Sequence, residues 1–464
     1  MVLFPQTPSV HLAVGVSRRE AWSWAMFDFA NSGYTTVVIT AIFNAYFVAV
    51  VAGNAPWATL AWTLALAGSY ALVMLTAPML GAYADAHTAK KRLLVFTTVG
   101  CIFFTGLLFF VGPGDLWIAV ALIVLSNFFF GSGENLIAAF LPEIAPGEAM
   151  GRVSGWGWSL GYVGGLISLG ASLGYVTWAQ AQGQGAAEFV PVTMLITAAI
   201  FALASLPTFL FLRERASEDR RRHSRISMTK RHRAATSHAK QRTEDSHVSG
   251  TSCRFKNHEG VLANLSSVFC RLSSEYPDLR RFLICLIFYQ AGIQAVIALA
   301  AIYAQQAMGF NTQDTLVLVV LVNITAAIGA FLFGNVQDRI GHVAAIGLTL
   351  IGWIVMVLLA FFAEGRAMFW LAANIAGLCL GASQSAGRAL VGFLTPPAHR
   401  AEFFGLWGWA VKLSSILGPV TYGLVSWVSG GDHRLAILIT GSYFVVGLLV
   451  LRGVDVGRGR RAVL

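Results

Sequence analysis

Long apolar runs separated by short polar stretches set the pattern of this chain. A helix that crosses a bilayer needs about 20 mostly apolar residues. The runs are continuous and rich in leucine and glycine, whereas a membrane β-barrel shows shorter segments of alternating hydrophobicity. We therefore expect an all-α polytopic membrane protein with twelve transmembrane helices. The predicted spans cover 22–51, 57–84, 93–112, 115–142, 152–177, 189–212, 282–305, 314–334, 343–363, 367–394, 402–428 and 434–452.

Two sets of six spans flank a polar stretch rich in Arg, Lys, His and Ser. We predict a six-helix bundle over 1–212, a basic and partly disordered linker over 213–281, and a second six-helix bundle over 282–464. Near the end of the linker, apolar residues recur at helical spacing. Residues 259–281 are therefore expected to form either an amphipathic helix on an anionic membrane surface or a short helix packed on the bundle. The apolar residues are Leu262, Leu265, Val268, Phe269 and Leu272.

The composition excludes most soluble proteins. Hydrophobic residues make up 56% of the chain and charged residues only 12%, against about 25% charged in soluble proteins. Nearly all of the 32 Lys and Arg residues fall in the terminal segments, the linker and every second loop. By the positive-inside rule, both termini and the linker are predicted to be cytoplasmic. Orientation in the lipid bilayer thus explains the net charge of +10, and no nucleic-acid partner is needed to explain it. The compact loops favour a bacterial inner membrane.

Weak internal similarity relates the two sets of spans. A shift of 250 positions superposes residues of two helices and the loop between them. These residues are Gly131, Glu134 and Gly155 on Gly381, Gln384 and Gly405. A second repeat lies after the second helix of each set, where an Asp follows a Gly by four residues and basic residues come next. Its members are Gly81, Asp85, Lys91 and Arg92 in the first copy and Gly334, Asp338 and Arg339 in the second. Two homologous, pseudo-symmetric six-helix bundles are the economical interpretation.

The loop motifs, GxxxD followed by basic residues, resemble the signature of the major facilitator superfamily. The segments WAMFDFANSGYTTVVIT, FLPEIAPGEAMGRVSGWGWSLGYVGG and AEFFGLWGWAVKLSSILGP are similar to its vacuole-effluxer-like branch. This resemblance implies the major facilitator fold and transport by alternating access, in a branch whose fungal members export amino acids from the vacuole. Helix seven reads FYQAGIQAVI, so Ala291 stands where the branch often has a carboxylate.

Four charged residues lie well inside predicted spans, away from the span ends, where each costs about 2.5 to 3.5 kcal/mol even on the lower scale. They are Asp28 in helix one, Glu134 in helix four, Arg388 in helix ten and Lys412 in helix eleven. All four lie at similar depth, and their charges sum to zero, so we expect them to pair across the interface between the halves. Such pairs would form an inner gate or bind a zwitterionic solute, with a proton site at Glu134 or Asp28. The alternative is a set of static pairs that hold the bundle together.

Uncharged amides concentrate on the first helix of each three-helix unit, the helices that line the cavity in this superfamily. They are Asn31, Asn135, Gln290, Gln294 and Gln384, which we assign with the four charges to a substrate or proton pathway, or else to interhelical packing. Helix five carries glycines that favour close approach of a neighbouring helix, namely Gly151, Gly155, Gly157, Gly161 and Gly165. At the helix starts, Arg152 and Glu402 either pair with each other or bind the loop residues Asp85 and Asp338.

The chain has no phosphate-binding GxxxxGK[ST] loop and no HExxH motif, so we expect no enzyme, no catalytic residue, no metal and no cofactor. The predicted function is secondary transport of a small polar organic solute, an amino acid or similar zwitterion, in the export direction, with protons as a possible coupling ion. Efflux of amphipathic compounds or lipids is an alternative, favoured by Phe128, Phe129, Phe130 and Tyr162. A scaffold or receptor that binds partners through the basic linker is another.

Overall fold

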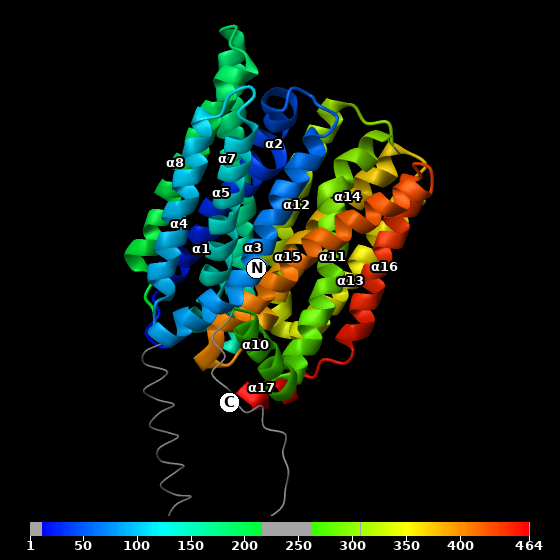
Figure 1. Cartoon of the computed structure of the whole chain (residues 1–464). Helices are drawn as coiled ribbons and strands as arrows, with labels where there is room; N and C mark the ends of the chain where they lie inside the picture. The colour runs from blue at the N-terminus through cyan, green and yellow to red at the C-terminus, as the bar shows by residue number, and fades with distance from the viewer. Residues whose placement is uncertain (1–11, 216–260, 307, 464) are drawn as a thin grey trace, which may run out of the picture.

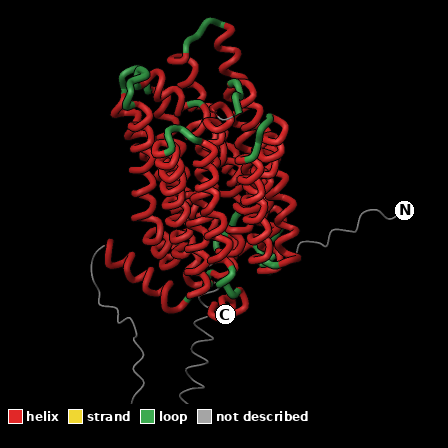
Figure 2. The backbone as a smooth tube through the Cα atoms, turned by 90° about the vertical axis from the view of Figure 1, so that its right-hand side faces the viewer, coloured by secondary structure: helices red, strands yellow, loops and turns green. Residues whose placement is uncertain are grey.

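The computed structural model describes residues 12–215, 261–306 and 308–463. Helices, turns and loops account for all of these residues, as the tube in Figure 2 shows. Within these residues, twelve helical segments are long and apolar enough to cross a membrane, which confirms the predicted all-helical membrane fold. They are Arg18–Val51, Ala58–His87, Lys90–Phe110, Leu116–Ile144, Gly147–Ala181, Ala186–Phe211, Pro277–Ile297, Val317–Ile340, His342–Phe361, Arg366–Leu394, Pro397–Val428 and His433–Leu451.

We call spans one to six the first half and spans seven to twelve the second half. The first half consists of α1 (Arg18–Tyr34), η1 (Thr35–Ala41), α2 (Phe43–Tyr46), η2 (Phe47–Val51), α3 (Ala58–His87), α4 (Lys90–Leu107), η3 (Leu108–Phe110), α5 (Leu116–Ala138), α6 (Leu141–Ile144), η4 (Gly147–Ala149), α7 (Met150–Ala181) and α8 (Ala186–Phe211). The helices that follow are α10 (Val261–Glu275), α11 (Pro277–Gln306), α12 (Thr312–Ile340), α13 (His342–Phe361), α14 (Arg366–Leu394), η5 (Pro397–His399), α15 (Arg400–Val428), α16 (His433–Leu451) and α17 (Val456–Val463).

The first span is not a uniform α-helix, because η1 and η2 are wound as π-helix. The sequence of η1 begins with six consecutive β-branched residues, TTVVIT, which lose side-chain freedom in an α-helix. The Thr40 hydroxyl donates to the Thr35 carbonyl five residues earlier, at 2.9 Å, which matches the wider winding. The apolar pattern predicted the span but not this irregularity.

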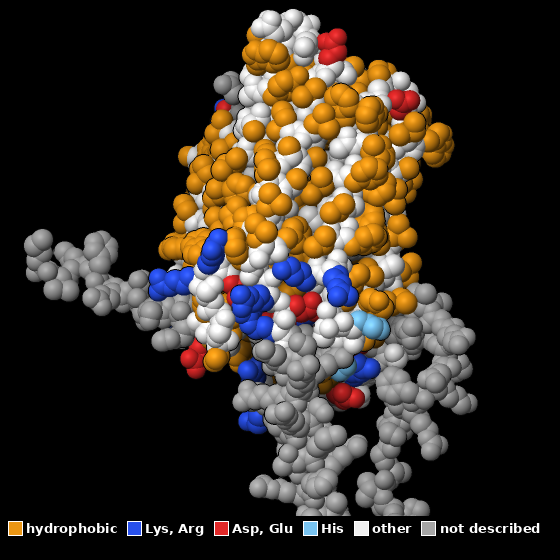
Figure 3. All heavy atoms as spheres, turned by 90° about the vertical axis from the view of Figure 1, so that its left-hand side faces the viewer, with side chains coloured by type: hydrophobic (Ala, Val, Ile, Leu, Met, Phe, Trp, Pro, Cys, Tyr) orange, Lys and Arg blue, Asp and Glu red, His pale blue; other side chains and the backbone are white. Residues whose placement is uncertain are grey.

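The two halves touch through two pairs of spans related by the pseudo-symmetry. Helix α3 of span two packs along α15 of span eleven, and α7 of span five packs along α12 of span eight (Figure 1). On the face that Figure 3 shows, hydrophobic side chains cover most of the surface, whereas Lys and Arg gather at one end. We call this the basic end. There α3, α8, α12 and α14 finish, and α4, α7 and α15 begin.

Glycines let the halves approach closely at the basic end. A Cβ on Gly155 of α7 would lie 2.5 Å from the carbonyl oxygen of Ala330 in α12. A Cβ on Gly334 would lie 2.7 Å from the Gly151 oxygen, and one on Gly81 would collide with the backbone of Ala401. Backbones therefore meet across both contacts, as the glycines of helix five led us to expect.

Most of the predicted linker, residues 216–260, lies outside the described residues. Helix α11 begins at Pro277, five residues before the predicted span. The preceding α10 packs on the bundle, because Val268 and Leu272 are buried and the Phe269 ring meets the Trp409 ring. Of the two alternatives for this segment, the structure has the short packed helix. Leu262 and Leu265 lie on α10, but their side chains are outside the described part of the chain. The bundle boundaries at 212 and 282 remain a prediction.

Candidate functional site

Arg388 of α14 reaches across the interface between the halves to Asp28 of α1. Its Nη1 donates to Asp28 Oδ2 at 2.7 Å. Its Nε donates to Ser154 Oγ at 3.1 Å and its Nη2 to the Ser154 carbonyl at 2.9 Å, both on α7. The guanidinium carbon lies 4.7 Å from the Trp24 ring centroid and 5.4 Å from that of Trp158. Every guanidinium nitrogen is therefore engaged, and the side chain is only 3% exposed.

Gly157 of α7 makes room for this pair. A Cβ at this position would collide with Asp28 Oδ2 and lie 2.6 Å from Arg388 Nη2 and 3.0 Å from a Trp24 ring carbon. Ser154 adds a further bond between the halves, because its hydroxyl donates to the Ser385 carbonyl of α14 at 2.8 Å. Span five thus supplies both the space for the pair and part of its hydrogen bonding.

Glu134 of α5 and Lys412 of α15 form a second pair across the same interface. The Lys412 Nζ lies 3.3 Å from Glu134 Oε2, near the upper limit for a hydrogen bond. It also lies 5.3 Å from the Tyr70 ring centroid and 5.8 Å from that of Phe130. The Glu134 side chain is 24% exposed and that of Lys412 is 9% exposed. This pair is looser and more accessible than the first.

The amides predicted with these charges are only partly brought together. Gln290 of α11 donates to Gln384 of α14 at 2.7 Å, a contact within the second half. Asn135 follows Glu134 on α5. Its amide packs against Gly408 of α15, where an added Cβ would collide with it. Asn31 is buried on α1, and its Oδ1 has no hydrogen-bond partner among the described residues. Gln294 is half-buried on α11.

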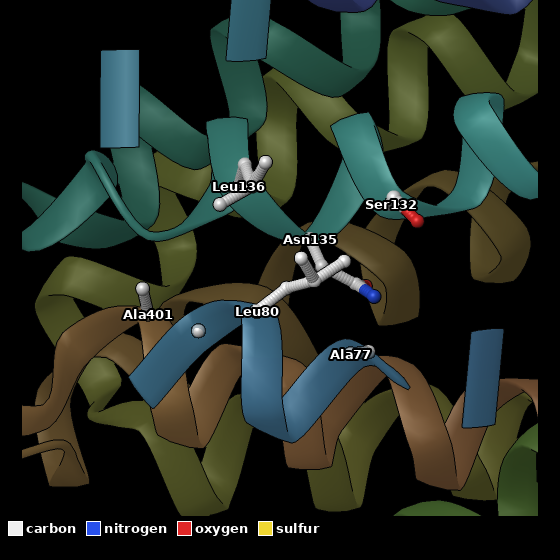
Figure 4. A pocket seen from close by; sticks show the side chains of 7 residues that line it. Ala77, Leu80, Ser132, Asn135, Leu136 and Ala401 are labelled. Carbon is white, nitrogen blue, oxygen red and sulfur yellow. The ribbon is translucent and has the colours of Figure 1, made fainter. Parts of the chain in front are cut away.

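A small pocket lies between α3, α5 and α15, toward the basic end (Figure 4). Ser132 and Asn135 contribute its polar atoms, and Gly81 and Ala401 are among the residues that line it. Its volume of about 10 Å³ corresponds to one water molecule. This pocket therefore has no room for a solute larger than water.

The two loop aspartates of the repeated motif cap helices of the opposite half. Asp85 accepts a hydrogen bond from the Glu402 N–H at 2.9 Å, at the start of α15. Asp338 accepts from the N–H groups of Gly151 and Arg152 at 2.9 and 3.2 Å, at the start of α7, and from Arg152 Nε at 2.9 Å. A carboxylate at a helix N-terminus is favoured by the helix dipole. Both contacts join the halves at the basic end.

Arg152 and Glu402 therefore each lie beside the loop aspartate of the other half rather than beside each other. The Glu402 carboxylate pairs with Arg271 of α10 at 3.0 Å and with His399 Nδ1 at 2.7 Å. The other basic residues of the two motifs differ in their surroundings: Lys91 Nζ donates to the Leu212 carbonyl at 2.7 Å, whereas Arg92 and Arg339 are exposed.

A buried network that the apolar pattern did not predict surrounds Glu143 at the basic end. The Glu143 carboxylate pairs with Lys90, and both side chains are fully buried. It also accepts from the Arg215 N–H at 2.9 Å and lies 3.7 Å from Arg400 of α15. The fourth span was predicted to end at residue 142, so Glu143 fell outside the predicted spans, as did Lys90 and Arg400. The signal available in the sequence was Glu143 itself, an acidic residue directly after Pro142 that has basic residues as its partners.

Three further residues of the site were also missed: Trp24, Tyr70 and Ser154. The position of Trp24, one turn before Asp28, was the available signal, because residues four apart lie on one helix face. No group of three His, Cys, Asp or Glu side chains that could hold a metal ion occurs in the part of the chain that the structure describes.

Comparison with known proteins gives consistent matches. The family model described as "Vacuole effluxer Atg22 like" matches residues 58–150 and 147–464. The "Uncharacterized MFS-type transporter YxiO" of Bacillus subtilis (strain 168) is 25% identical over 443 residues, which cover 92% of this chain and 93% of that protein. "Autophagy-related protein 22" of Cryptococcus neoformans var. neoformans serotype D (strain B-3501A) is 28% identical over 205 residues, 40% of this chain and 37% of the fungal protein.

Solved structures with a similar fold include two transporters. The human organic anion transporter MFSD10 (TETRAN) has a TM-score of 0.65 and 16% identity, over 94% of this chain and 99% of that one. The proton:xylose symporter XylE has a TM-score of 0.67 and 14% identity, over 94% and 95% of the two chains. At these identities the likeness extends to the fold alone.

Proposed function

The chain belongs to the family of vacuole effluxer Atg22-like proteins in the major facilitator superfamily, and from this premise we propose that it exports a small polar organic solute by alternating access. An amino acid or a similar zwitterion is the proposed solute class. Such a protein is a secondary active transporter and not an enzyme. The observation that carries the proposal is the pair of opposite-charge contacts between the halves, Asp28 with Arg388 and Glu134 with Lys412.

Alternating access requires contacts between the halves that form in one state and break in the other. At the basic end these contacts include Asp85 with the start of α15 and Asp338 with the start of α7. With these contacts made, the basic end is closed. Opening this end requires the halves to separate there. This separation would also lengthen the contacts within the buried ion pairs, because each pair joins the two halves.

A zwitterion suits the buried charges because it carries one partner for each sign. Removing one member of a buried ion pair costs about 3 to 5 kcal/mol, since the other charge is left uncompensated. A solute ammonium facing a carboxylate, together with a solute carboxylate facing a base, would leave no charge unpaired. Glu134 and Asp28 are the proposed sites for a coupling proton, and the uncharged amides Asn31, Asn135, Gln290, Gln294 and Gln384 are proposed to line the same pathway.

The proposal assigns the basic end to the cytoplasm, by the positive-inside rule. Both termini then lie in the cytoplasm, and the membrane is a bacterial inner membrane. An exporter would load its solute when the basic end is open and release it at the opposite end. The motif residues at the basic end would form the gate that closes this entrance.

Counterflow in proteoliposomes tests the proposal. Vesicles loaded with a mixture of unlabelled amino acids are placed in labelled ones, and uptake is followed for the wild type and for Lys412→Gln. The matched control is Arg366→Gln, which removes a positive charge at the opposite end, where Arg366 pairs with Asp314 and is 56% exposed. We expect stereoselective accumulation by the wild type and the control but not by Lys412→Gln. No accumulation by correctly folded wild type would contradict the proposal.

Efflux of amphipathic compounds is the second candidate, favoured by aromatic rings beside the pairs. Phe130 lies beside Lys412, and Tyr162 packs against Trp158 at a centroid distance of 5.9 Å. The Phe129 ring instead faces away from the site and packs against aromatic rings of α4. Broad inhibition of transport by hydrophobic cations, without stereoselectivity, would favour this candidate. A scaffold that acts through the linker would lose its activity when residues 220–258 are deleted, whereas a transporter would keep it.

A further inference from the structure

We propose that the two ion pairs have different roles: Glu134 and Lys412 bind the solute, whereas Asp28 and Arg388 hold the halves together at the basic end. This inference rests on the proposed function and adds to it, because it names which acid and which base meet the solute. Both pairs lie at similar depth on the interface between the halves, so depth does not distinguish them. They differ in their hydrogen bonding and in their exposure.

The Arg388 guanidinium is shielded from a solute carboxylate in this arrangement. Three of its five N–H groups donate, one to Asp28 and two to Ser154, two indole rings lie beside it, and the side chain is only 3% exposed. Ser154 is itself fixed by its bond to the Ser385 carbonyl. A solute carboxylate that paired with Arg388 would compete with Asp28, which lies in the space left by Gly157. Arg388 is therefore a positioning residue that bridges α1 and α7 of the first half and α14 of the second.

Lys412 is less engaged than Arg388. Its ammonium group carries three donors, and among the described residues its carboxylate contact is a single long one of 3.3 Å to Glu134. A compact ammonium on a flexible stem also accepts a new partner without the planar geometry that a guanidinium requires. The Glu134 side chain is 24% exposed and that of Asp28 is 12% exposed, so Glu134 is the more accessible of the two acids.

The spacing of this pair fits a zwitterion whose two charges lie close together. In an α-amino acid, one carbon atom separates the ammonium and the carboxylate, so both can meet adjacent partners with little movement of either side chain. The solute ammonium would replace Lys412 as the partner of Glu134, and Lys412 would turn to the solute carboxylate. The rings of Tyr70 and Phe130 would then flank the bound solute. A γ-amino acid, with three carbons between its charges, would fit less well.

Gly131 provides a test that leaves every charge in place. A Cβ on this residue of α5 would lie 3.3 Å from Lys412 Cε and 3.2 Å from Val73 Cγ2. Such contacts are tight, so Gly131→Ala would hinder the movement of Lys412 toward the solute. Gly170→Ala on α7 is the matched control, because a Cβ there meets nothing within 4 Å.

The test combines two measurements on the full-length chain in detergent. The first is equilibrium binding of an equimolar mixture of labelled L-amino acids. The second is the alkylation rate of a single cysteine at Ala401, which is buried between the halves at the basic end, after replacement of the five native cysteines. Chromatographic elution and the thermal unfolding midpoint identify variants that have not folded.

We expect Lys412→Gln and Glu134→Gln to lower binding by about tenfold or more, and Gly131→Ala to lower it by a smaller factor. We expect Arg388→Gln to lower binding less than Lys412→Gln does and to be alkylated faster than the wild type. Loss of binding in Arg388→Gln, with binding retained in Lys412→Gln, would overturn the assignment. Equal changes in both variants, in binding or in alkylation, would do the same. If the wild type binds no amino acid, the proposed function fails, and the alkylation rates still decide whether the two pairs differ.

Discussion

A single methyl group at Gly157 should weaken the closure of the basic end. The Cβ of Gly157→Ala would meet Asp28, Arg388 and Trp24 at once. Trp24 is fully buried, and its indole N–H donates to the Ile137 carbonyl at 2.9 Å, so the ring has no space to move. The available relief is rotation of Asp28 away from the added methyl group. That rotation breaks the 2.7 Å contact with Arg388 and removes the charged link between the halves.

The magnitude follows from the packing cost alone. An extra methyl group in a well-packed interior costs about 1 to 3 kcal/mol. Replacing Gly by Ala also raises helix propensity, but α7 is helical whether the basic end is closed or open, so this gain does not change the balance between the two states. The cost to the closed state is therefore about 1 to 3 kcal/mol, which corresponds to a change of roughly 5- to 150-fold in an equilibrium constant.

The alkylation rate of the cysteine at Ala401 measures this change, since that position is reached only when the basic end opens. The matched control is Gly174→Ala on the same helix, where a Cβ meets nothing within 4 Å. We expect Gly157→Ala to be alkylated several times faster than the wild type and Gly174→Ala to be alkylated at the wild-type rate. Equal rates for all three proteins, each folded by its elution and unfolding midpoint, would refute the reasoning.

Three further changes at the basic end should have graded effects. Asp338→Asn removes the negative charge at the start of α7, so we expect faster alkylation at the basic end, and an unchanged rate would contradict a gating role. Arg271→Ala removes one partner of the buried Glu402 carboxylate but leaves His399 beside it, so the unfolding midpoint should fall by less than the equivalent of the roughly 3 to 5 kcal/mol expected when a buried charge loses its whole counter-charge. Glu143→Gln leaves the fully buried Lys90 without its counter-charge, so a loss of about 3 to 5 kcal/mol should greatly reduce the yield of folded protein. A normal yield of Glu143→Gln would show that Lys90 finds another partner.

The sequence by itself determined the number of spans, the helical class and the residues most in need of an explanation. Apolar runs of membrane length are a local property, so twelve spans could be counted without knowing how they pack. The cost of an unpaired charge in a membrane is likewise independent of the fold, which is why Asp28, Glu134, Arg388 and Lys412 stood out. The repeated loop motif likewise placed Asp85 and Asp338 at equivalent helix ends.

Only the tertiary structure decided which charge meets which. Two acids and two bases at similar depth allow two pairings, and the choice depends on how each helix is rotated and on which spans of the two halves adjoin. Only the tertiary structure decided, too, that the two pairs differ in hydrogen bonding and exposure. Ser154 and Trp158 reach Arg388 because Gly157 brings α7 against α1, and the residues in this contact lie more than a hundred positions apart in the sequence. The buried partner of Lys90 was hidden for a related reason, since hydropathy assigns a charged residue at a helix end to water, and only the fold of the neighbouring helices excludes that water.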